Sequence, residues 1–154
     1  MMMYVEVLKI CDRHAERLQW AMHEMQGRLP FDAHVLGELS GIELAILDQF
    51  TARFSKLQDM MGAKLFPVIL ELTKEQGELS GFIDKLNRLE KNGVIASAHD
   101  WLILAEMRNS FSHEYPDEPE IQASLLNKSF VLANELLATL DDVKSYANRY
   151  VSEG

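Results

Sequence analysis

Four side chains suited to acid–base or phosphate chemistry lie close together near the end of an apolar segment. They are Arg108, Asn109, His113 and Tyr115, in the spacing RNxxxHxY. Histidine suits proton transfer because its pKa lies at about 6.5, and arginine suits a two-pronged contact with phosphate. Transfer at a phosphate needs a base, an acid and a cation for the developing negative charge, and these residue types can supply such groups without a metal.

The segment from Trp101 to Pro116 carries these residues and is predicted to begin as a helix. In a helix, Arg108 shares a face with Trp101 and Leu104, because residues three, four and seven apart lie on one side. A guanidinium on an apolar face must find a carboxylate, a phosphate or carbonyl groups. Three acids of the helix expected to end at Gly62 are candidates, although each is more typical of a surface residue: Glu43, Asp48 and Asp59.

Proline at position 116 limits how far this helix can extend. Pro116 disfavours the helical conformation of the residue before it, so the helix is predicted to end between Phe111 and Tyr115. His113 then lies near a helix terminus, where free carbonyl groups and the helix dipole favour a cation. Arg108 and His113 could therefore also be a helix cap and a structural ion pair.

The run RNSFSHEY resembles the RxxxxHxY motif of the HEPN superfamily, and specifically that of the HepT-like toxins encoded beside a minimal nucleotidyltransferase (MNT) antitoxin. Arg108 and His113 match the family's catalytic pair, Asn109 matches the polar residue common after the arginine, and Tyr115 completes the HepT version. The resemblance implies a helical-bundle dimer whose Arg and His motifs line a shared cleft and cut RNA without metal or another cofactor.

A dimer also agrees with the chemistry of the residues. The motif holds one histidine, whereas base and acid are two tasks, so one chain supplies half a site and a twofold dimer could bring two copies together. Asn109 would orient the histidine or a phosphate, or else cap the helix. Tyr115 could pack, contact RNA or be modified, and the resemblance implies that the MNT partner transfers AMP to it. An adenylyl group there would exclude an RNA phosphate from Arg108 and His113.

The overall charge favours a rival interpretation. A formal net charge of −9 argues against a broad nucleic-acid surface, so RNA must meet a local basic site. Two groups could form that site or be ordinary solvated faces: the row Lys85, Arg88 and Lys91, and the pair Arg53 and Lys56. A non-catalytic HEPN-like subunit that binds substrate for, or regulates, a nucleotidyltransferase fits the acidity better, and a plain dimeric scaffold is a third possibility.

Length and composition indicate an ordinary globular protein with one domain over residues 1–154. Cys11 is the only cysteine, which excludes a disulfide framework and indicates a buried small hydrophobe. His14 and His23 lack metal-ligand spacing, and no metal site is expected. No signal peptide or membrane span is recognisable, so we expect a cytoplasmic protein.

Apolar spacings of three and four predict an all-α fold, an antiparallel up-and-down bundle of four long helices plus a short one. Trp20 and Trp101 are expected in the core or an interface rather than as RNA platforms. The first helix is expected over 4–26, and the second from Leu36 or Ser40 to Gly62 with Ile42 on its apolar stripe. A short helix or a kinked continuation follows over 63–76, and then a helix that Ser80 caps and Asn92-Gly93 ends, with Phe82 and Ile83 facing inward. The motif helix starts at Ser97 or Ala98, and a final helix covers 121–150.

Overall fold

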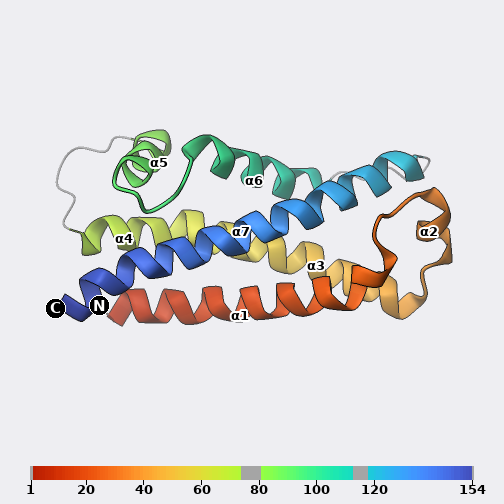
Figure 1. The fold of residues 1–154 in the computed structure, drawn as a ribbon, viewed down its shortest axis with the longest axis horizontal. Helices are drawn as coiled ribbons and strands as arrows, with labels where there is room; N and C mark the ends of the chain where they lie inside the picture. The colour runs from red at the N-terminus through yellow and green to blue at the C-terminus, as the bar shows by residue number, and fades with distance from the viewer. Residues whose placement is uncertain (1, 74–80, 113–117, 154) are drawn as a thin grey trace.

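The computed structural model describes residues 2–73, 81–112 and 118–153 (Figure 1). Within these ranges the chain forms helices, turns and bends and contains no strand, which confirms the all-α prediction for this part of the chain. The helices are α1 (Met2–Met25), α2 (Ala33–Glu38), α3 (Gly41–Met60), α4 (Phe66–Leu72), α5 (Phe82–Lys91), α6 (Ala98–Ser110) and α7 (Pro119–Glu153), with a 3₁₀ turn η1 (Gln26–Arg28) and a π-helical turn η2 (Met61–Leu65).

The long helices lie along the longest axis of the molecule and successive ones run in opposite directions (Figure 1). α1 and α3 pack side by side, α7 contacts both of them, and α6 contacts α3 and α7. α5 lies beside α6 at the end of the molecule where both chain termini are found. The last turn of α6 is therefore supported by α3, and this contact positions the start of the motif.

α1 buries one stripe of side chains against the other helices. Cys11, Leu18 and Met25 follow one another at a spacing of seven and are fully buried, as the periodicity predicted. Burial raises the pKa of the Cys11 thiol to about 12, with a further contribution from neighbouring Asp12, so the thiol is protonated at neutral pH. The prediction that Cys11 belongs to the core is confirmed.

α3 begins with a capping box, in which the Ser40 hydroxyl accepts from the Glu43 amide and the Glu43 carboxylate accepts from the Ser40 amide. The helix continues through η2 into α4, with Pro67 in the first turn of α4. Residues 63–76 thus begin as a continuation of α3, which is one of the two predicted alternatives. Of the two predicted starts of the second helix, Ser40 is correct and Leu36 is wrong. Ile42 lies on the exposed side instead of the buried stripe, with 76% of its surface accessible.

α5 differs from its prediction at its beginning. Its N-cap is Gly81 and its first two apolar residues, Phe82 and Ile83, are exposed, whereas Leu86 and Leu89 are buried. A ten-residue helix packed along one side can bury only a narrow stripe, and Phe82 and Ile83 lie outside it. The Ser80 proposed as the cap lies outside the described residues.

The loop after α5 returns the chain to the core, as predicted. Gly93 adopts φ +78°, a conformation that favours glycine and ends α5 in a tight turn. Val94 and Ile95, which follow it, are buried. They seat the start of α6 against the other helices.

Trp101 is buried, as expected, whereas Trp20 is 50% exposed on α1, so an interface is the alternative of its prediction that stays open. The number of short helices needs correction. The linker after α1 contains the short helix α2, capped by Asp32, and α2, α4 and α5 together exceed the single short helix predicted. None of the helices in the described ranges has the length and apolar character needed to cross a membrane.

Candidate functional site

The motif begins in the last turn of α6. Arg108 and Asn109 belong to this turn, and the helix ends at Ser110 with Phe111 as its C-cap, one residue before the predicted range. His113 and Tyr115 lie outside the described residues. The structure therefore places the arginine half of the motif, and the roles of His113 and Tyr115 stay predictions.

Both ends of α6 are held by specific contacts. At its start, the Ser97 hydroxyl accepts from the Asp100 amide and the Glu90 carboxylate accepts from the Ala98 amide at 2.7 Å. Trp101 is buried one turn later, with its ring centroid 4.6 Å from that of Phe66 on α4. These contacts set the rotation of α6 and so determine which side of the helix Arg108 occupies.

A cluster of phenylalanines fastens the other end of α6 to α3. The Phe111 ring meets Phe54 edge to face at 5.3 Å and Phe50 at 6.4 Å between centroids. Phe50 in turn stacks on Phe130 of α7 at 4.2 Å, and Phe31 packs against Phe130 at 5.6 Å. The role of Phe111 was not predicted from the sequence, although an aromatic side chain three residues after Arg108 is a signal of such an anchor. This residue ties the chain just after Arg108 to the core.

Arg108 forms an ion pair with Asp59 of α3. The side chains are 31% and 62% exposed, so the pair lies at the rim of the molecule rather than inside it. Of the three candidate acids, Asp59 is the partner, and Glu43 instead binds Arg28 through two hydrogen bonds of 2.7 and 2.9 Å. The inward orientation predicted for Arg108 is only partly correct, because the buried stripe of α6 runs through Trp101, Leu104 and Met107 and Arg108 lies beside it, 31% exposed.

Asn109 contacts the same guanidinium. Arg108 Nη2 donates to Asn109 Oδ1 at 3.3 Å, so the amide helps to hold the arginine. The carbonyl group of Asn109 accepts from the Ser112 hydroxyl at 2.7 Å, and the Ser110 hydroxyl donates to the Glu106 carbonyl at 3.1 Å. The Asn109 carbonyl also accepts from the Ser112 amide at 3.2 Å, so the two serine hydroxyls add bonds at the end of the helix. The arrangement presents a partly exposed guanidinium that Asp59 and Asn109 contact.

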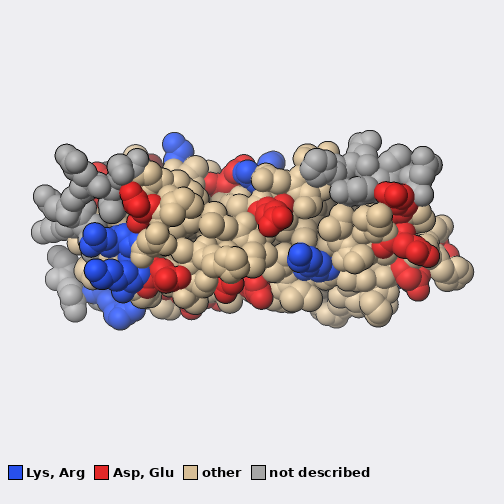
Figure 2. Space-filling model, turned by 90° about the horizontal axis from the view of Figure 1, so that it is seen from above, with Lys and Arg blue, Asp and Glu red and all other residues tan. Residues whose placement is uncertain are grey.

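The charges on this side of the molecule are unevenly distributed. Figure 2 shows Lys and Arg side chains gathered at the left end, with some acidic side chains beside them, and Asp and Glu side chains gathered at the right end. The right end is the one at which α7 begins (Figure 1). α6 runs towards that acidic half (Figure 1). A phosphate approaching Arg108 from this side meets an unfavourable potential. An RNA substrate would need a basic surface elsewhere.

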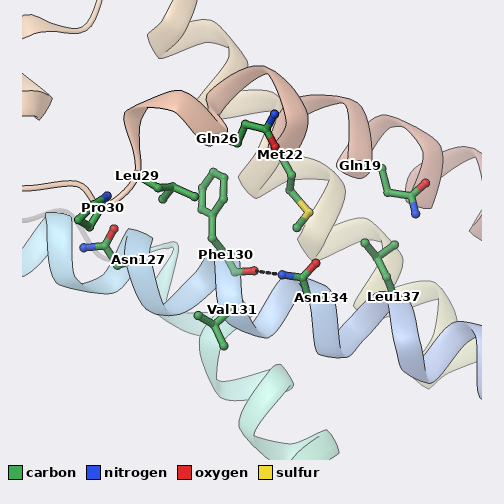
Figure 3. A pocket seen from close by; sticks show the side chains of 10 residues that line it. All are labelled: Gln19, Met22, Gln26, Leu29, Pro30, Asn127, Phe130, Val131, Asn134 and Leu137. Carbon is green, nitrogen blue, oxygen red and sulfur yellow. Dashed lines mark hydrogen bonds between the residues drawn. The ribbon is translucent and has the colours of Figure 1, made fainter.

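A cavity of about 720 Å³ lies between α1 and α7, away from the motif (Figure 3). The side chains of Gln19 and Met22 face it from α1, that of Gln26 from η1, and those of Asn127 and Asn134 from α7. No charged side chain lines it. The amide of Asn127 is already used, because it bonds the Phe31 amide and carbonyl at 2.7 and 2.9 Å. This neutral cavity is unsuited to holding a phosphate.

Comparison of the chain with family models, with curated proteins and with solved structures finds no match. The resemblance to HepT-like HEPN proteins accordingly rests on the residues of the motif.

Proposed function

We propose that the protein is a metal-independent endoribonuclease toxin of a HEPN/MNT toxin–antitoxin pair. The observation that carries the proposal is the placement of Arg108: the motif starts at the end of an apolar helix, and its guanidinium lies partly exposed at the rim, held by Asp59 and Asn109. An arginine in this position can bind a scissile phosphate, whereas one enclosed in the core cannot.

In this proposal His113 moves protons and Arg108 stabilises the phosphorane charge. The 2′-hydroxyl attacks the adjacent phosphorus, its proton passes to a histidine base, and the leaving 5′-oxygen takes a proton from an acid, which leaves a 2′,3′-cyclic phosphate. Because one motif has one histidine, the second proton donor comes from the other copy in a twofold dimer of up-and-down bundles. The protein acts in the cytoplasm.

Regulation is assigned to Tyr115 and to a nucleotidyltransferase antitoxin. Transfer of AMP to the tyrosine hydroxyl adds bulk and a negative charge close in sequence to Arg108 and His113. The modified site then repels the phosphate of an RNA substrate. A Tyr115→Phe variant should remain toxic when it is expressed together with the antitoxin, because it lacks the acceptor hydroxyl.

The proposal is tested by incubating purified protein with a mixed RNA substrate in EDTA. Cleavage is expected from the wild type and from Tyr115→Phe, with 2′,3′-cyclic phosphate ends, and is expected to disappear in His113→Ala and Arg108→Ala. Thermal unfolding and size-exclusion chromatography of the variants serve as controls for folding and dimerisation. Absence of cleavage by an unmodified wild-type dimer would overturn the nuclease assignment.

A second candidate function is favoured by the ion pair itself. Asp59 already neutralises Arg108 within one chain, and the acidic side chains beside the start of α7 repel phosphate. Both features suit a non-catalytic HEPN-like subunit that binds substrate for, or regulates, a nucleotidyltransferase. This candidate predicts that expression of the wild type is harmless. It fails if expression is toxic and His113→Ala abolishes the toxicity while the dimer persists.

A further inference from the structure

α1 and α3 bring five basic side chains together on one side of the molecule. Arg13, His14 and Arg17 come from α1, and Arg53 and Lys56 come from α3. A hydrogen bond of 2.9 Å between Arg53 Nη1 and His14 Nδ1 joins the two helices at the centre of the group. A guanidinium can only donate, so Nδ1 is the acceptor and the imidazole is neutral. These five residues form the basic cluster.

The pKa shifts within the basic cluster come from desolvation and from positive neighbours. Desolvation lowers the pKa of His14, and so do the charged groups that act on it, namely the other four members of the basic cluster. The pKa of Arg53 is lowered by desolvation and then by Arg17 and Arg13. In the described part of the chain, the buried Nε of Arg53 has no hydrogen-bond partner. Concentrated positive charge of this kind is unusual in a chain with a net charge of −9 and favours an external anion.

An exposed aromatic ring extends the basic cluster. Arg13, Arg17 and Trp20 are four and three residues apart on α1, so they lie along one face of the helix. Trp20 is 50% exposed, and its apolar ring gains nothing from water there. Guanidinium groups beside an exposed indole are the combination that binds single-stranded nucleic acid, because phosphates pair with the cations and bases stack on the ring.

The basic cluster also leads towards the motif. Arg53, Lys56 and Asp59 follow one another at a spacing of three, which forms an inclined row across α3, and Asp59 binds Arg108. Arg53 and Asp59 are about 9 Å apart along the helix axis. Because α1 and α3 run in opposite directions (Figure 1), Trp20 lies beyond His14 on the side away from Asp59. Measured along the axes of α1 and α3, Trp20 and Asp59 are about 18 Å apart, with the basic cluster between them.

We propose that the basic cluster, together with Trp20, binds the backbone and one base of a single-stranded RNA whose next phosphates reach Arg108. This inference rests on the proposed ribonuclease function, for which it supplies the substrate-docking surface that the acidic end lacks. The lysines and arginines hold phosphates without reading sequence, and the indole accepts any base, so the contact positions RNA rather than selecting it.

The test measures binding of a fluorescent single-stranded RNA oligonucleotide by anisotropy, with His113→Ala in every chain to prevent cleavage. Arg13→Gln/Arg17→Gln should weaken binding about tenfold or more and lower the slope of log K against log salt by about 1.4, because two phosphate contacts are lost. Trp20→Ala should weaken binding about tenfold through loss of stacking. The matched control is Lys85→Gln/Lys91→Gln on α5, which removes the same charge from the other basic row and should leave the affinity within about twofold.

Three results would overturn the inference. Equal losses in the α1 and α5 double variants would show a response to net charge alone. Unchanged RNA affinity in the Arg13→Gln/Arg17→Gln variant would refute the docking surface. If Trp20→Ala keeps its RNA affinity but forms a smaller oligomer, the indole belongs to an interface between copies. Thermal unfolding of each variant confirms that it is folded.

Cleavage assays on chains with His113 intact separate this inference from the proposed function. The α1 variant should raise KM about tenfold and leave kcat unchanged, because docking is remote from the reacting atoms. Cleavage with an unchanged KM would overturn the docking surface and leave the nuclease intact. RNA binding that depends on the basic cluster, without cleavage by the wild type, would overturn the nuclease and leave the docking surface.

Discussion

The ion pair between Arg108 and Asp59 joins the last turn of α6 to α3 at the rim of the fold. It connects the only described cation of the motif to the helix that also carries Arg53 and Lys56. A pair this exposed contributes at most about 1 kcal/mol to folding. Its main effect is therefore to hold a guanidinium in one place, next to Asn109. Under the proposed function, the Asp59 carboxylate takes the place of a phosphate oxygen.

Asp59→Asn should free Arg108 for substrate. Under the proposed function the RNA phosphate and the Asp59 carboxylate compete for one guanidinium, so the substitution should lower KM by up to about fivefold, the equivalent of about 1 kcal/mol. The free energy of unfolding should fall by no more than about 1 kcal/mol. Cleavage kinetics and urea denaturation measure the two effects.

The matched control for this experiment is Asp48→Asn, which removes an exposed acid from the same helix without touching Arg108. It should leave KM unchanged. A decrease in kcat for Asp59→Asn alone would contradict the competition and would make Asp59 a positioning residue for Arg108. A fall in stability of several kcal/mol for Arg108→Ala would instead support the plain scaffold.

Phe111 should stabilise the end of α6 more than its partial burial suggests. Phe111→Ala removes the edge-to-face contacts with Phe50 and Phe54 and should cost about 2–3 kcal/mol, below the range for a fully buried phenylalanine. Phe82→Ala is the control, since that ring is exposed on α5 and should cost less than about 1 kcal/mol. Equal costs in urea denaturation would refute the anchoring role of Phe111.

Protonation of His14 should lower the free energy of unfolding in mild acid. Desolvation and the four surrounding cations lower its folded pKa below the ordinary 6.5, so the unfolded chain takes up the proton first as the pH falls. The contribution of neutral His14 to the free energy of unfolding is fully present above about pH 7.5. It decreases as the pH falls through 6.5 towards the folded pKa and no longer changes below that pKa. NMR titration of the imidazole and thermal unfolding between about pH 7.5 and 5.5 measure the effect, which His14→Gln should abolish.

The ion pair of Glu43 with Arg28 should make the free energy of unfolding fall in stronger acid. The hydrogen bonds from Arg28, followed by the one from the Ser40 amide, lower the pKa of this carboxyl from 4.5 to about 2. Its stabilising contribution is present above about pH 4.5 and disappears as the pH falls towards about 2, because the unfolded carboxyl is protonated first. Glu43→Gln should flatten the acid limb of the unfolding curve. An unchanged curve would show that the pair with Arg28 does not stabilise the fold.

The sequence predicted well those features that depend on local spacing. The stripe through Cys11, the turn at Gly93, the end of the motif helix near Phe111 and the start at Ser40, one of two starts that the sequence allowed, follow from side-chain periodicity and backbone preferences within one segment. Ile42 and Phe82 were assigned wrongly because periodicity shows which residues share a face. It does not show how much of that face a neighbouring helix covers.

What the sequence determined by itself was the all-helical character of the described chain and the residue content of the motif. Tertiary structure alone chose Asp59 among three acids, since the choice depends on the rotation of α3 against α6. It also placed Arg53 against His14 and so combined Arg13, Arg17 and Trp20 of α1 with the basic residues of α3. Each of these groupings needs two helices in one relative position, and the packing of side chains far apart in the sequence decides that position.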